Sequence, residues 1–166
     1  MTEELEQLLK NLRLKRMFEI YVEQLHAAEK EDVSYTEFLL RLLRSEWHSS
    51  QEQSLEARIK RAHLPELWTL ETFPYAKQPG INRRQIRTFA ELDFIPKAEN
   101  IVFIGKTGVG KTGIAIGLML KSLQNGYRGL FIRAQDLFDD MYASLADRSS
   151  RRLLNRLVGL DVLAID

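Results

Sequence analysis

The sequence has no cysteine, which excludes disulfide bonds and thiolate metal sites. It has no apolar run near the ~20 residues that a membrane-spanning helix needs. Its formal net charge is only +1, so any contact with nucleic acid must come from local patches of charge. The N-terminus is acidic and amphipathic, unlike a signal peptide. We therefore expect a soluble, cytoplasmic protein with no membrane partner.

The composition is otherwise that of an ordinary globular protein, since 45% of the 166 residues are hydrophobic. This length fits one domain or two small units. Residues 1–68 predict a small all-helical N-terminal domain, because leucines recur there at helical spacing with charged residues between them. We expect helical character to continue to about His63, where Pro65 ends it.

Residues 69–98 have a different character. Pro74, Pro79, Gly80 and Pro96 interrupt this segment. Proline and glycine at this density predict a partly extended linker, with one short helix over residues 82–92.

The most informative stretch is residues 101–112. The run at residues 101–104 is apolar and largely β-branched, which predicts a buried strand. A phosphate-loop motif follows this run. It consists of Gly105, four further residues, and then Gly110, Lys111 and Thr112. A predicted apolar helix comes next and stops at residues 125–126. Strand, loop and helix in this order predict an α/β fold of the P-loop NTPase class, with residues 99–166 as its core.

Each part of this loop has a physical role in holding a triphosphate. Glycines let successive backbone N–H groups point inward, and the helix N-terminus adds its dipole. Lys111 brings a charge to the β and γ phosphates, and the Thr112 hydroxyl takes one Mg²⁺ position. The expected cofactors are ATP and Mg²⁺. The residues expected to bind them are Gly105, Lys106, Thr107, Gly108, Val109, Gly110, Lys111 and Thr112.

Two further strands are predicted, at residues 129–132 and at residues 160–165, and the second leads into Asp166. An apolar strand that ends in aspartate behind a phosphate loop is typical of a carboxylate that orients Mg²⁺. The alternative is a core strand with a capping aspartate. We expect Thr112 and Asp166 to hold the metal ion, and Lys111 and Asp166 to be the catalytic residues.

Each of three basic clusters fits either a solvated face or a contact to DNA phosphates. They are Arg58, Lys60, Arg61 and His63; Lys77, Arg83, Arg84 and Arg87; and Arg148, Arg151, Arg152 and Arg156. The first also fits pairing with a helix C-terminal dipole. The second also fits a charge placed near the nucleotide, and the third also fits contact with a neighbouring subunit. Phe94 and Ile95 fit either core packing or contact with an adenine ring. The histidines have no metal-ligand spacing, so metal catalysis through histidine is not expected.

Several motifs outside the loop resemble a known family. They are Ser34-Tyr35-Thr36-Glu37-Phe38-Leu39 with Glu46-Trp47, Thr69-Leu70-Glu71-Thr72-Phe73, Gln78-Pro79-Gly80, and Leu92-Asp93-Phe94-Ile95 leading through Ala98-Glu99-Asn100. With the phosphate loop they make essentially the whole chain similar to the IstB-type ATP-binding helpers of insertion-sequence transposases. Those proteins are relatives of the DnaC helicase loader among the AAA+ ATPases.

The resemblance implies an AAA+-like partial parallel sheet with helices. It also implies an ATP-dependent DNA-binding protein that directs a transposase to its target, with DNA, the transposase and further copies of the chain as partners. Two alternatives remain open: a helicase loader of the DnaC type, and a non-enzymatic interaction module left over from such a protein.

The sequence departs from the family in two places. Gly113 follows the loop where the family usually has histidine, and it is expected to cost the helix start up to ~1 kcal/mol relative to alanine. The chain ends at Asp166, before the family's catalytic glutamate, sensor residue and arginine finger. We therefore expect a truncated core that binds ATP and hydrolyses it very slowly, which leaves open whether it is an enzyme. The strand at residues 101–104 is expected either to leave a gap in the sheet or to pair directly with the Asp166 strand.

Overall fold

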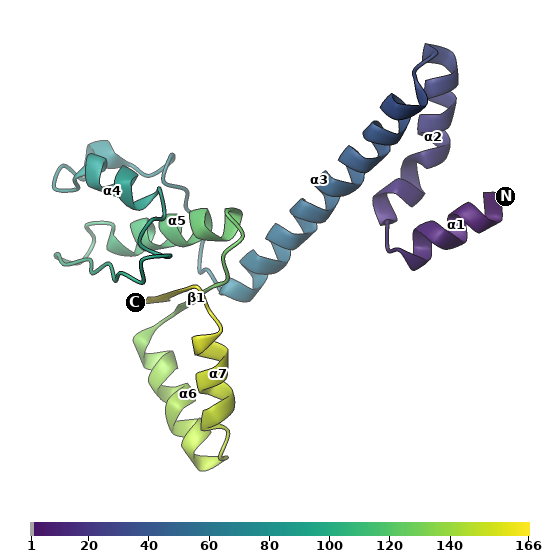
Figure 1. The fold of residues 1–166 in the computed structure, drawn as a ribbon. Coiled ribbons are helices and arrows are strands. Elements are labelled where there is room, and N and C mark those ends of the chain that lie inside the picture. The colour runs from purple at the N-terminus through teal and green to yellow at the C-terminus, as the bar shows by residue number, and fades with distance from the viewer. Residues whose placement is uncertain (1) are drawn as a thin grey trace. The chain divides into compact units, whose positions relative to one another are not determined.

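The computed structural model describes residues 2–166, which fold as two compact units. One unit extends to Ser54 and the other runs from Leu55 to Asp166. The long helix α3 (Tyr35–Ala62) continues from the first unit into the second (Figure 1). Within residues 2–166, no helix is both long and apolar enough to cross a membrane.

The first unit contains α1 (Thr2–Asn11), α2 (Lys15–Glu31) and most of α3. The apolar stripes of these helices meet in one cluster, which consists of Leu9, Met17, Ile20, Tyr21 and Leu42. Two polar contacts tie the helices together. The Tyr21 hydroxyl donates to Glu6 Oε1 at 2.8 Å, and the Met17 N–H donates to Glu46 Oε2 at 2.8 Å.

The second unit contains the predicted phosphate loop and its surroundings. Its elements are η1 (Tyr75–Lys77), α4 (Arg83–Phe89), α5 (Lys111–Gln124), β1 (Gly129–Ile132), α6 (Ala134–Ala146), α7 (Ser150–Val158) and β2 (Val162–Ile165). Helix α4 lies within the predicted range and starts after Asn82, whose side chain accepts hydrogen bonds from two N–H groups of its first turn. Helix α5 ends where predicted, with Gly126 just beyond it at φ 91°.

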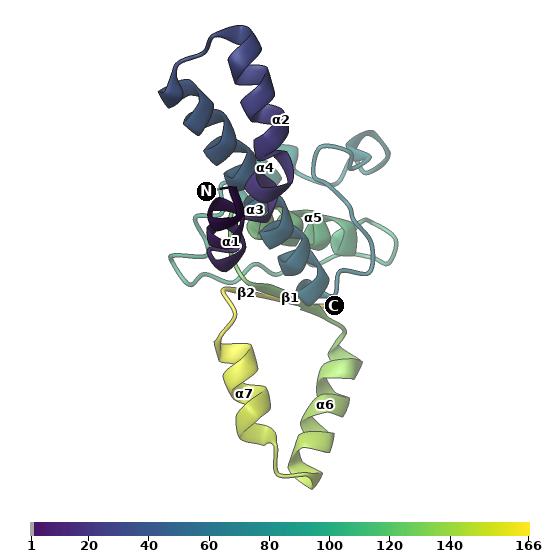
Figure 2. The ribbon, with the colours of Figure 1, turned by 90° about the vertical axis from the view of Figure 1, so that its right-hand side faces the viewer.

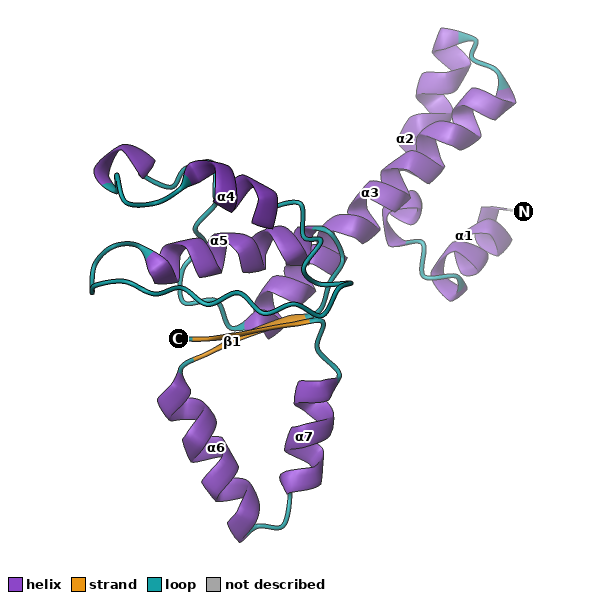
Figure 3. Ribbon diagram, turned by 60° about the vertical axis from the view of Figure 1, so that its left-hand side comes forward, coloured by secondary structure: helices purple, strands orange, loops and turns teal. Residues whose placement is uncertain are grey.

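Strands β1 and β2 form a parallel pair in the register Gly129↔Val162 to Ile132↔Ile165. Both follow the sequence prediction closely. The connection between them is the α6–α7 hairpin, which lies on one side of the strand pair, while α4 and α5 lie on the other (Figures 2 and 3). This arrangement brings the C-terminal end of β2 to the same sheet edge as the start of α6.

The strand predicted at residues 101–104 does not form. Among residues 2–166 the sheet contains only β1 and β2, and no backbone hydrogen bond joins residues 101–104 to either of them. The side chains still alternate: Ile101 and Phe103 pack against the core, whereas Val102 is 76% exposed and Ile104 is 93% exposed. The apolar sequence favours an extended chain, but a strand also needs a hydrogen-bonded neighbour. Of the two expected outcomes, the gap in the sheet is the one observed.

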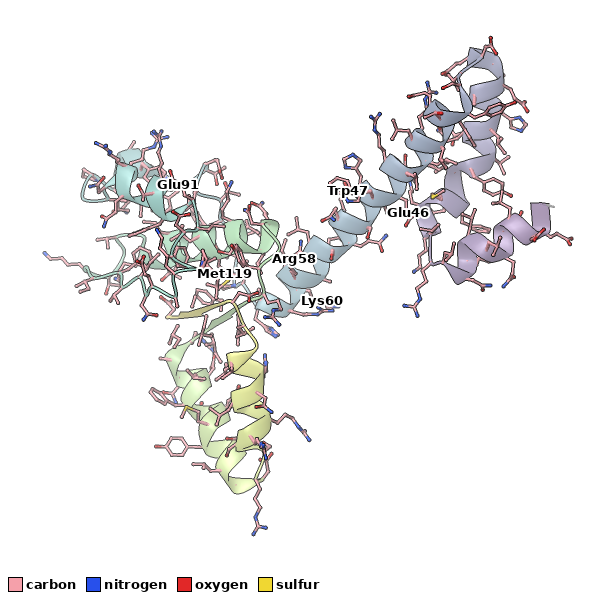
Figure 4. All side chains as sticks on the ribbon, in the orientation of Figure 1. Glu46, Trp47, Arg58, Lys60, Glu91 and Met119 are labelled. Carbon is pink, nitrogen blue, oxygen red and sulfur yellow. The ribbon has the colours of Figure 1, made fainter. Side chains whose placement is uncertain are left out.

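Helix α5 is the most buried element of the second unit. Its Met119 and Leu123 form a cluster with Ala62, at the end of α3, and all three side chains are at most 1% exposed. Arg58, labelled in Figure 4, reinforces this junction. Its Nε donates to the Leu123 carbonyl at 2.9 Å. A guanidinium at the carboxyl end of a helix stabilises the helix dipole. This contact is with the end of α5, a different helix from α3, which carries Arg58.

On another face, α5 packs against residues 69–81, which we call the brace. A Cβ atom added to Gly117 would lie 2.7 Å from Leu70 Cδ2, and one added to Gly113 would lie 3.2 Å from Phe73 Cε2. A Cβ on Gly110 would lie 2.6 Å from Phe73 Cζ. These glycines recur along one face of the helix. Their lack of side chains therefore allows the brace to approach α5 closely, most of all at Gly110 and Gly117.

We predict that Gly117→Ala lowers the free energy of unfolding by about 1 kcal/mol. Overpacking against Leu70 costs about 1–3 kcal/mol, which exceeds the ~1 kcal/mol gained from better helix propensity. Gly113→Ala is the matched control, with a longer contact and a net change within about 0.5 kcal/mol. Urea unfolding of the two variants measures the difference. A Gly117→Ala variant more stable than the parent would contradict the close packing of the brace.

Candidate functional site

The phosphate loop of residues 105–112 leads directly into the N-terminus of α5. Gly108 and Gly110 have φ values of 82° and 89°, in the left-handed region that glycine adopts without a steric penalty. Gly110 is the N-cap residue, so Lys111 is the first residue of the helix. The loop therefore presents flexible backbone beside the positive end of a helix dipole, which is the arrangement that binds anions in proteins.

Lys111 folds back across this loop. Its Nζ donates to the carbonyl oxygens of Gly105 at 3.0 Å and Lys106 at 2.9 Å. Both acceptors are neutral backbone groups, so the ammonium carries a charge that no carboxylate offsets among the contacts of residues 2–166. A phosphate oxygen bearing a negative charge would be a stronger partner for this ammonium than either carbonyl.

Thr112 and Asp166 lie next to each other, although 54 positions separate them in the sequence. The Thr112 hydroxyl donates to Asp166 Oδ1 at 2.9 Å. Backbone pairing fixes Asp166 there, because its N–H donates to the Ile132 carbonyl at 3.1 Å and its own carbonyl accepts from the Ala134 N–H at 2.8 Å. The hydroxyl and carboxylate that were expected to share a metal ion are therefore adjacent.

An ion pair fixes the opposite end of the two strands. Arg128, just before β1, donates from Nε and Nη2 to the two carboxylate oxygens of Asp161, each at 3.1 Å. The Arg128 N–H also donates to Asp161 Oδ2 at 2.7 Å. These hydrogen bonds lower the pKa of Asp161, with the guanidinium as the main cause. The pair sets the register that carries Asp166 to Thr112.

Two cavities lie beside the loop. The first, of about 640 Å³, is lined by parts of α4, by residues 101–105 and by Phe89, Phe94 and Lys111. The second, of about 940 Å³, contains Thr112 and Asp166 together with Trp68, Phe73, Arg133, Asp136 and Asp140. Asp136 is held by Arg133, whose Nε and Nη2 donate to its two carboxylate oxygens at 2.8 and 3.1 Å. Both cavities therefore combine apolar and charged side chains, and the second is the one that contains Thr112 and Asp166.

The oxygen atoms of Thr112 and Asp166 suit Mg²⁺ only as part of a larger set of ligands. Within residues 2–166, no three His, Asp or Glu side chains gather as a self-contained metal site. Thr112 and Asp166 together offer only oxygen ligands, which Mg²⁺ prefers, and the ion commonly completes its shell with water and substrate phosphates. The chemistry of these two residues thus suits an ion that arrives with a phosphate ligand.

Comparison with known proteins agrees with this geometry. The family model for the IstB-like ATP binding protein matches residues 7–166. This chain belongs to that family. The IstB-family members that it resembles include a Pseudomonas aeruginosa protein described as an ATP-binding protein of insertion sequence IS21, with 36% identity over 98% of this chain and 62% of that protein.

Two further IstB-family relatives bear similar descriptions. One, from Geobacillus stearothermophilus and insertion sequence IS5376, is 34% identical over all of this chain and 66% of its own length. Another, from Bacteroides fragilis and an IS21-like element, is 31% identical over 98% of this chain and 82% of its own length. The chain thus spans about two thirds of the first two relatives.

The structure brings the loop residues expected at the site together with Asp166, which was also expected there and directly follows β2. It also places two side chains there that were not expected, both from the brace. Phe73 lies under Gly110, and Gln78 Nε2 donates to the Gly108 carbonyl at 3.2 Å. Both belong to motifs that carried the family resemblance. The glycines at the start of α5 were the signal that another segment packs closely against the loop.

We predict that Asp161→Asn lowers the urea midpoint at pH 7, because a neutral amide cannot replace the charged acceptor of the Arg128 pair. The pKa of Asp161 is lowered by folding from its ordinary value of 3.8. Its stabilising contribution is therefore fully present above pH 3.8 and is lost as the pH falls through the lower folded pKa.

The difference between parent and variant should accordingly shrink in urea titrations below that pH. Asp93→Asn is the control, since it removes an exposed pair with Lys97 and should change the midpoint little. A pH-independent difference at Asp161 would refute this assignment.

Proposed function

We propose that this chain binds Mg²⁺-ATP through its phosphate loop and serves as the ATP-binding helper of an insertion-sequence transposase. The single observation that carries the proposal is the hydrogen bond between Thr112 and Asp166, beside a phosphate loop whose lysine donates to two backbone carbonyls. The descriptions of the relatives support the link to insertion sequences.

In this proposal each residue has a distinct task. The Lys111 ammonium leaves its two carbonyl partners for the terminal phosphates, and the loop N–H groups cradle the phosphate chain. Thr112 and Asp166 would hold Mg²⁺, which neutralises charge on the phosphates when it is bound. Because the hydroxyl and carboxylate are already adjacent, binding the ion requires little rearrangement of the chain.

We propose that binding, rather than rapid turnover, is the task of residues 1–166. Besides Asp166, the carboxylates that line the cavity of about 940 Å³ are Glu66, Asp136 and Asp140. Both carboxylate oxygens of Asp136 accept hydrogen bonds from Arg133, and Glu66 accepts one from Trp68 Nε1, so neither group is free to turn toward an attacking water. Slow hydrolysis would let nucleotide occupancy act as a lasting signal to a partner.

We further propose that residues 1–68 form a helical module that, with the core, contacts DNA, the transposase and other copies of the chain, while residues 69–98 link the two. The descriptions of the relatives favour this role over loading a replicative helicase, because they name insertion sequences. Retained partner binding without ATP binding would instead support a non-enzymatic interaction module.

We predict that Lys111→Ala weakens Mg²⁺-ATP binding about 10- to 100-fold, the loss expected for a hydrogen bond to a charged group. Asp166→Asn should reduce the ratio of affinities measured with Mg²⁺ and with a chelator, and leave metal-free binding nearly unchanged. Titration of a fluorescent ATP analogue measures both. Lys121→Ala, in the last turn of the same helix, is the matched control. Equal affinities for parent and Lys111→Ala would end the proposal.

DNA binding through α7 gives a separate prediction. Arg151, Arg152 and Arg156 are exposed, and none is in an ion pair among those of residues 2–166. Their replacement by glutamine should weaken duplex binding and reduce the slope of log affinity against log salt by about 0.9 per lost contact. Lys121→Gln, which lies outside the three basic clusters, is a single-site control. An unchanged slope would remove α7 from the DNA interface.

A further inference from the structure

Gln78 connects the brace to the middle of the phosphate loop. Its side chain is half-buried and borders both cavities beside the loop. Its backbone is fixed at both groups, since its N–H donates to the Tyr75 carbonyl and its carbonyl accepts from the Ile81 N–H, each at 3.1 Å. From this anchored position, Gln78 Nε2 donates to the Gly108 carbonyl at 3.2 Å.

The brace itself is held firmly against α5. Phe73 is buried against the glycine face of the helix, and the Tyr75 ring packs edge-on against it with centroids 4.9 Å apart. The Arg83 guanidinium in turn lies 5.0 Å from the centre of the Tyr75 ring. These contacts mean that Gln78 reaches the loop from a segment with a defined position, not from a free linker.

The hydrogen bond to the Gly108 carbonyl also affects the direction of the next N–H group, that of Val109. The peptide between Gly108 and Val109 is planar and trans, so its C=O and N–H point in opposite directions. Holding the carbonyl toward the brace therefore turns the Val109 N–H away from the brace. Gly108 is a glycine with open space around it, so this peptide could rotate at low steric cost without such a bond.

We propose that Gln78 is a positioning residue for nucleotide binding. By holding the Gly108 carbonyl, it keeps the Val109 N–H directed to the nucleotide's phosphate groups, so that the loop is ordered before the ligand arrives. This inference rests on the proposed function, because it assigns a role within the same phosphate site. Among the side-chain hydrogen bonds of residues 2–166, the others to carbonyls of this loop come from Lys111, which the ligand itself would recruit.

The variant that isolates this role is Gln78→Met, which preserves side-chain length and removes the donor. Gln78→Glu is the second variant, since it preserves shape and also cannot donate when ionised. Gln51→Met, on the exposed surface of α3, is the matched control. Urea unfolding establishes that each variant is folded before its binding is measured.

The experiment is an ADP titration of chains labelled with ¹⁵N and ¹³C, followed by NMR. In the parent and in Gln51→Met we expect the Val109 amide proton to move downfield as it donates to a phosphate. In Gln78→Met and Gln78→Glu that shift should diminish, while the Lys111 and Thr112 amides still respond. ADP affinity should fall about fivefold, the order expected for one neutral hydrogen bond. An unchanged Val109 response and affinity would overturn the proposal.

A measurement without nucleotide separates this inference from the proposed function. The ¹³C shift of the Gly108 carbonyl should change in Gln78→Met before any ligand is added, because its hydrogen bond is lost. If the parent does not bind ADP, the proposed function fails. The positioning role of Gln78 then fails with it, whatever the ¹³C shift of Gly108 shows. If the parent binds ADP but the Gly108 carbonyl is the same in both chains, only the role of Gln78 is refuted.

Discussion

The close packing of α5 on several sides is the constraint on which the candidate site depends. One face of the helix is lined with glycine and accepts the brace, and another carries Met119 and Leu123 against the end of α3. Interiors packed to this density transmit small displacements, so a helix held in this way has little freedom to shift. Because the phosphate loop ends at the first residue of α5, the position of the helix fixes the position of the loop.

The polar side chains of the site are hydrogen-bonded within the chain. Lys111 is bound to loop carbonyls, and the Thr112 hydroxyl is bound to Asp166. Each of these hydrogen bonds involves a group that would bind a nucleotide or its metal ion. That group can exchange its present partner for the ligand. The cost of opening the site is then the exchange of modest hydrogen bonds for charge-assisted ones, which favours binding. A loop arranged in advance also loses less conformational freedom when the ligand binds.

The extended segment before the loop exposes apolar side chains and backbone that pairs with no strand among residues 2–166. Val102 and Ile104 face solvent although both are β-branched and apolar, and their backbone has no neighbouring strand within residues 2–166. Unpaired extended backbone with apolar side chains tends to recruit another strand. The phosphate loop nevertheless keeps its form, because α5, the brace and the Asp166 contact hold it from other directions.

The sequence by itself determined the local features. The spacing from Gly105 to Thr112 fixed the loop and the start of α5, and the apolar runs located β1 and β2, since these depend on turn chemistry and side-chain periodicity over a few residues. Only the tertiary structure decided that residues 101–104 remain unpaired, because pairing depends on a partner elsewhere in the chain. It also decided that a segment predicted as a linker would place Phe73 and Gln78 against the loop. Contacts between distant segments depend on how whole elements pack. The local propensities of the residues do not predict that packing.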